Sequence, residues 1–136
     1  MATDPEINFI SVALTELTFK LNEAFVRPKD GMPIEISVKS KNSLSPDKTI
    51  LKVILSVSLF GKTENQPFEM KVSVAGTFTG KDTKELEKFS KIHAPAHLFP
   101  FVREIIGTTT MKAGIPPLLL PPFNLASLLS TKKHPA

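Results

Sequence analysis

A strict alternation of apolar and polar residues is the feature that most constrains how this chain can fold. It is strongest from Thr49 to Phe60, and it recurs from Ile34 to Lys39 and from Phe68 to Phe78. Alternation with a period of two is typical of β-strands that have one buried and one solvated face. We therefore predict a strand in each segment, with the apolar side chains on one face of a shared sheet. In the strongest segment that face consists of Leu51, Val53, Leu55, Val57 and Leu59.

A further strand is predicted from Ile7 to Leu21, which is rich in β-branched and aromatic residues and lacks Pro and Gly. Its apolar phase changes near Thr15 and Glu16. A β-bulge or bend at that point would bring both halves onto one face. Burial of both faces would also explain the pattern. The apolar positions are Ile10, Val12 and Leu14 in the first half and Leu17, Phe19 and Leu21 in the second.

The connections between the predicted strands are short and rich in turn-forming residues. None can hold a crossover helix, so successive strands should pair as an antiparallel meander. The apolar face of that sheet needs a cover, which the C-terminal third can supply. We predict a single α+β domain over residues 1–136, with the sheet at about 7–80 and helices with a crossover at about 83–131.

The predicted cover begins with a helix that Asp82 or Thr83 can cap. Pro95 should interrupt it, after which a helical stripe resumes and Gly114 can end it. A crossover follows in which two Pro pairs bracket three leucines, residues 118–120. The prolines favour an extended connector with little freedom to lose on ordering.

This crossover, residues 115–122, is an apolar segment in a chain whose composition is otherwise that of a soluble protein. Contiguous exposed apolar patches are rare on monomers and usually mark binding sites. The segment therefore predicts a surface that binds other polypeptides. An ordinary connector packed under the sheet is an equally good interpretation. After the crossover, Asn124 can cap a short C-terminal helix.

The chain has no residue pattern that predicts a catalytic site, a metal site or a cofactor. His93 and His97 are four residues apart, but there is no Cys and no HExxH motif to complete a zinc site. Arg103 and Glu104 are adjacent, so on a helix they point about 100° apart and are not natural partners. No Ser-His-Asp grouping is recognisable. We therefore do not expect an enzyme.

The charge balance is mildly basic, with a formal net charge of +4 and a pI near 9.4. The lysines are scattered, so we expect no nucleic-acid partner, although a nucleic-acid-binding sheet face or a small-ligand cavity under the crossover stays an alternative. The first residues do not form a signal peptide, and the apolar run Ile115–Phe123 is too short to span a bilayer. We expect a cytoplasmic protein without membrane insertion, which the absence of Cys fits.

Two segments of the C-terminal third, LFPFVREII and KAGIPPLLLPPFNLASLL, carry a resemblance to the SecB protein-export chaperone family. LFPFVREII, residues 98–106, is similar to the family's LFPYARExI, and KAGIPPLLLPPFNLASLL, residues 112–129, is similar to RGxFPxLxLxPVNFxALY. Two weaker similarities lie upstream. ELTFK, residues 16–20, stands where the family has DISFE, and KVSVAGTF, residues 71–78, stands where it has EVxxxGxF.

The resemblance implies a four-stranded antiparallel sheet with a long helix and a short C-terminal helix. It also implies a homotetramer built as a dimer of dimers, and ATP-independent holding of unfolded or precursor polypeptides in apolar grooves. No cofactor is implied. On this resemblance, the residues expected to bind client are Phe99, Phe101, Ile115, Leu118, Leu119, Leu120 and Phe123.

The sequence departs from the family where its translocase partner would bind. The resemblance implies that SecA docks on acidic residues of the sheet and on the C-terminal tail. Lys20 and Lys71 stand where Glu is expected, while Glu16 keeps its acidic character. These residues are the candidates for partner docking, and the two lysines argue against SecA binding in the usual way. A chaperone in protein export and a stand-alone chaperone of an antitoxin or another dedicated client are therefore both open.

Overall fold

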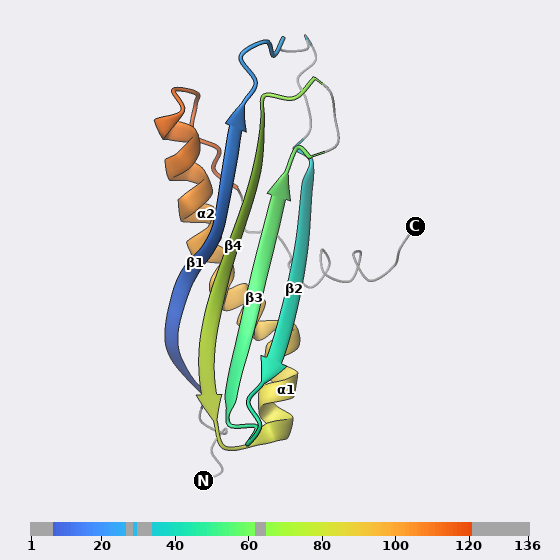
Figure 1. Ribbon diagram of the computed structural model, residues 1–136, viewed down its shortest axis with the longest axis vertical. Helices are drawn as coiled ribbons and strands as arrows, with labels where there is room; N and C mark the ends of the chain where they lie inside the picture. The colour runs from blue at the N-terminus through green and yellow to red at the C-terminus, as the bar shows by residue number, and fades with distance from the viewer. Residues whose placement is uncertain (1–6, 27–28, 30–33, 62–64, 121–136) are drawn as a thin grey trace, which may run out of the picture.

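The computed structural model describes residues 7–26, 29, 34–61 and 65–120. Four antiparallel strands form one sheet, and two helices lie against one of its faces (Figure 1). The predicted α+β class with a four-stranded antiparallel sheet is confirmed. The predicted short helix after Asn124 lies outside the described residues, as does Phe123. The elements are β1 (Ile7–Leu21), β2 (Ile36–Leu44), β3 (Ile50–Leu59), β4 (Phe68–Gly80), α1 (Thr83–Lys91) and α2 (His93–Lys112).

The order of the strands across the sheet is β1-β4-β3-β2, which corrects the predicted meander. Strands β2, β3 and β4 do form a meander, but β1 pairs with β4 and not with β2. The lengths explain this choice, because β1 has 15 residues and β4 has 13, whereas β2 has only 9. Pairing the two long strands satisfies more backbone groups and also places Phe19 and Phe9 beside phenylalanines of β4.

Strand β1 contains the bulge that its sequence predicts. The register shifts between Leu14 and Glu16, so that Thr15 has no partner in the ladder. As a result Leu14 lies opposite Val74 and Leu17 lies opposite Val72, and both leucines point to the helix side of the sheet. The Thr15 hydroxyl donates a hydrogen bond of 3.1 Å to the carbonyl of Ser73. A second shift, between Phe9 and Ser11, was not predicted.

The core lies between the sheet and α2, as the alternating pattern requires. The apolar face of β3 is buried, and α2 covers it with Leu98, Val102 and Ile106. The helix comes very close to β4 at Gly76, where an added Cβ atom would lie 2.6 Å from Cδ2 of Leu98. Only glycine leaves room for this approach without moving the leucine.

The two helices begin and end at residues with clear physical roles. Asp82 caps α1 by accepting hydrogen bonds from the amides of Lys84, at 3.0 Å, and Glu85, at 3.3 Å. The interruption predicted at Pro95 was wrong, because the chain breaks at Ile92 and Pro95 lies in the first turn of α2. A first turn tolerates proline since its amides have no acceptor within the helix. Just after α2, Gly114 takes the left-handed conformation with φ of +83° and turns the chain back.

Candidate functional site

The crossover runs back along α2 and is fastened to it by Thr110. The buried Thr110 hydroxyl donates to the carbonyl of Ile106 at 2.9 Å and accepts from the amide of Leu118 at 2.8 Å. The crossover also packs against α2 at Gly107, where an added Cβ atom would lie 3.5 Å from Cδ2 of Leu119, an ordinary van der Waals distance. The crossover is therefore held at a fixed distance from the helix and is not a loose connector.

The three leucines of the crossover differ in their exposure. Leu120 is buried in the core, Leu118 is half-buried, and the side chain of Leu119 is 78% exposed. A groove of about 330 Å³ separates this segment from the exposed side of α2. An apolar side chain is thus presented to solvent beside a groove whose helix side consists of one proline and two charged residues. The groove is lined by Pro100, Arg103, Glu104, Leu119 and Leu120.

The other residues predicted to bind client lie at different depths. Both phenylalanines belong to α2, but Phe99 is buried, whereas Phe101 is 39% exposed. Ile115 is half-buried against the core. The structure thus brings Leu119 and Leu120 together in the groove, leaves Phe101 on the surface, and places Phe99 in the core of this protomer.

A second apolar surface lies on β1, on the same side of the sheet as the helices. The bulge turns Leu14 and Leu17 toward that side, but α2 packs mainly on β3 and β4 and leaves them uncovered. Their side chains are 50% and 42% exposed. Phe9, at the start of the strand, is partly covered by His97 of α2, with the ring centroids 4.7 Å apart. Neighbouring exposed apolar side chains of this kind are typical of surfaces that bind another chain.

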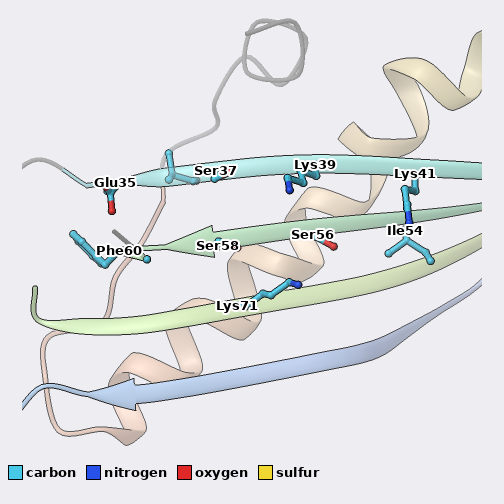
Figure 2. Close-up of a pocket in the computed structure, with 11 residues that line it drawn as sticks. Glu35, Ser37, Lys39, Lys41, Ile54, Ser56, Ser58, Phe60 and Lys71 are labelled. Carbon is cyan, nitrogen blue, oxygen red and sulfur yellow. The ribbon is translucent and has the colours of Figure 1, made fainter. Parts of the chain in front are cut away.

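The opposite, outer face of the sheet is polar and basic. It holds a shallow hollow of about 600 Å³ over β2, β3 and β4. Figure 2 shows Lys39 and Lys41 on β2 and Lys71 on β4, with Ser56 and Ser58 on β3 between them. The hollow is lined by Glu35, Ile36, Ser37, Lys39, Lys41, Ile54, Ser56, Ser58, Phe60, Gly61 and Lys71.

The residues predicted to dock a partner all lie on this outer face. Glu16 and Lys71 form an ion pair of 3.4 Å, and each side chain is about half exposed. Lys20 lies farther along β1, opposite Glu69. An exposed pair of this kind contributes about 0–1 kcal/mol to stability. Its main effect is to neutralise this part of the face.

The titratable groups of the described residues do not form a reaction centre. His93 and His97 are exposed on α2 and contact the rings of Phe89 and Phe9. No group of three or more metal-ligating side chains occurs among the described residues. Hydrogen bonds from Ser45 and Thr49 lower the pKa of the Asp47 carboxyl below its usual range, but they do so within the turn between β2 and β3.

Sequence reasoning missed two parts of the site. The role of Thr110 was missed, because its hydrogen bond to residue 118 depends on how the chain folds back. The basic outer face was missed because Lys39, Lys41 and Lys52 were treated as scattered charges. Their common outward phase on the alternating strands was the available signal.

Neither helix in the described part of the chain is both long and apolar enough to cross a bilayer. A family model for preprotein translocase subunit SecB matches residues 3–135. The protein-export protein SecB of Bradyrhizobium diazoefficiens is 31% identical over 136 residues, which cover 93% of this chain and 82% of that protein. An uncharacterized protein of Methanocaldococcus jannaschii is 28% identical over 131 residues, covering 91% of this chain and 83% of its own.

Among solved structures, the fold is similar to a SecB-like chaperone of Mycobacterium tuberculosis in complex with a ChAD peptide from the HigA1 antitoxin. The TM-score is 0.70 at 16% identity, and the alignment covers 85% of this chain and 89% of that chain. A protein of unknown function from Streptococcus agalactiae has a TM-score of 0.52 at 9% identity, over 88% of this chain and 99% of that chain. At such identities the similarity concerns the fold alone.

Proposed function

The chain belongs to the SecB family, and from this membership we propose that it is an ATP-independent holdase that keeps non-native polypeptides from aggregating. The observation that carries the proposal is the exposed Leu119 on a crossover fastened beside α2. Leu119 lines a groove, and exposed apolar surface at a groove is typical of a binding site.

Burial of apolar surface supplies the affinity in this proposal. Each Å² of apolar surface removed from water contributes about 25 cal/mol. An unfolded client offers such surface, whereas a folded client hides it, and this difference gives selectivity for non-native chains. Client contact centres on Leu119 and Phe101, which are exposed, and on Ile115 and Leu118, which are half-buried. Leu120 lines the groove and Phe99 lies in the core, while Phe123 stays a proposed client residue outside the described residues.

The proposal includes a tetramer, built as a dimer of dimers. Strand β1 is 15 residues long and lies at an edge of the sheet. Long edge strands readily pair with another chain. The uncovered side chains of Leu14 and Leu17 add apolar surface beside that edge. Pairing of β1 with its copy therefore supports the first dimer, with helices packed between the two sheet layers of the tetramer.

A cytoplasmic protein that holds clients can serve export or a dedicated client. The outer face of the sheet favours the dedicated client, since Lys71 neutralises Glu16 where the family resemblance implies an acidic SecA site. Light scattering of the protein alone and with SecA separates the two. A tetramer that does not change mass with SecA supports a stand-alone chaperone, and formation of a complex supports export.

The test of the holdase is suppression of aggregation of a chemically unfolded client, without ATP, at equimolar protein. We expect Leu119→Ser to weaken suppression severalfold, because it removes the most exposed apolar side chain of the groove. Ile50→Ser is the matched control, since Ile50 is a similar exposed side chain on the outer face of the sheet. If the wild-type protein fails to suppress aggregation, or both variants lose equally, the proposal is wrong.

A further inference from the structure

The outer face of the sheet carries three lysines that are near neighbours on two strands. Lys39 and Lys41 are two residues apart on β2 and point to the same face, and Lys52 lies on β3 opposite Ser43. All three are exposed, and within the described residues none of them forms an ion pair. Like charges at neighbouring positions of a sheet repel one another and cost stability. A ligand that carries the opposite charge would offset this repulsion.

The shape and the remaining polar groups of the hollow define that ligand further. The hydroxyls of Ser56 and Ser58 lie on β3, beside the lysines of β2. The hydroxyl oxygens of Ser56 and Ser73 form a hydrogen bond of 2.7 Å. Lysine ammonium groups and serine hydroxyls can both donate hydrogen bonds to carboxylates. The negative side chains nearby lie apart from one another: Glu35 lines the hollow just before β2, and Glu16 on β1 pairs with Lys71. Lys39, Lys41 and Lys52 thus form a positive patch on β2 and the first half of β3.

The spacing of the lysines matches an extended peptide. Side chains two residues apart on a strand are about 6.6 Å apart, so Lys39 and Lys41 present charges at that interval. An extended peptide repeats at the same interval, and carboxylates on alternate residues would meet both lysines. A single-stranded nucleic acid fits less well, because its bases need exposed aromatic rings for stacking. Phe60 is the aromatic residue lining the hollow, and it is only 4% exposed.

We infer that the basic face formed by Lys39, Lys41 and Lys52 docks an extended acidic segment of a partner polypeptide, with carboxylates on alternate residues. This face lies across the sheet from the crossover groove. A client in the groove and an acidic partner on the basic face can therefore bind together. The inference is independent of the holdase proposal, and its failure would leave that proposal untouched.

Fluorescence anisotropy with a labelled peptide of alternating Glu and Ser tests the inference, with the matching Gln-Ser peptide as the uncharged probe. We expect the Glu peptide alone to bind. Lys39→Gln with Lys41→Gln should weaken binding about tenfold, the combined effect of two exposed charge pairs. Raising the salt from about 50 mM to about 300 mM should weaken wild-type binding more than binding by this double variant.

Lys84→Gln with Lys91→Gln is the matched control, because it removes the same charge from exposed positions of α1. It should bind as the wild type does. If the first double variant does not fold, Lys52→Gln alone should still weaken binding about threefold. Three results overturn the inference: both peptides bind alike or not at all, both double variants lose affinity equally, or an oligothymidine of the same charge binds more tightly than the Glu peptide.

Discussion

Thr110 is the residue on which the position of the crossover depends most directly. Its hydroxyl is the acceptor for the amide of Leu118, at 2.8 Å, and it is fully buried. Thr110→Val keeps the shape of the side chain and removes this acceptor. A buried amide without an acceptor costs about 1–3 kcal/mol. We expect the free energy of unfolding, measured with urea, to fall by about that amount and hydrogen exchange at Leu118 to accelerate.

The neighbouring Thr109 provides a control for this prediction. It is half-buried, and its hydroxyl makes no hydrogen bond among the described residues. Thr109→Val should therefore change the free energy of unfolding by less than about 0.5 kcal/mol. Equal losses in the two variants would show that helix propensity, and not the bond to the crossover, explains the effect of Thr110.

Exposure of single residues was the least predictable part of the site. Phe99 and Phe101 belong to one motif, yet the first is buried and the second is 39% exposed. Residues that are two apart on a helix point about 200° apart around its axis, so one of the two phenylalanines must face away from the sheet. The sequence identifies the motif, but which of the two faces inward depends on how α2 is rotated against the sheet.

At the scale of the elements, the bulge in β1 was predictable because it leaves a trace in the pattern. The apolar phase on the two sides of Thr15 can share a face only if one residue is left out of the ladder. The strand order was not predictable in the same way. Short connections fix the pairing of β2, β3 and β4, whereas β1 is joined to β2 by a longer segment and can reach either edge.

The bulge gives a test at this scale, namely deletion of Thr15. Without Thr15 the ladder becomes regular from Ser11 to Leu21, and Leu14 still lies opposite Val74 while Glu16 still lies opposite Ser73. We expect the variant to fold, with a free energy of unfolding lower by about 1 kcal/mol for the lost Thr15–Ser73 hydrogen bond. Circular dichroism and urea unfolding measure this.

Deletion of Ser73 from β4 is the contrasting variant. That strand is regular and pairs with both β1 and β3. The deletion therefore makes every residue on one side of the deleted position point to the opposite face of the sheet. It should abolish folding. If deletion of Thr15 also abolishes folding, then the twist of the bulge, and not only the phase of the side chains, is essential to β1.

At the scale of the whole molecule, the two faces of the sheet differ in their chemistry. The helix side combines the packed core with the crossover groove and the uncovered leucines of β1. The outer side carries the lysines and serines of the basic face. Alternation along each strand separates the two sets of residues, so a substitution on one face leaves the chemistry of the other unchanged.

The uncovered leucines of β1 give the last prediction, which concerns assembly. We expect a wild-type mass in light scattering of four times the 14.9 kDa of the chain. Leu14→Glu with Leu17→Glu should lower this mass, because burying two carboxylates at an apolar interface costs several kcal/mol per charge. Ser11→Glu with Ala13→Glu adds the same charge to the outer side of the same strand and should keep the tetramer. A wild-type monomer, or a tetramer in the leucine variant, would contradict a role of this surface in assembly.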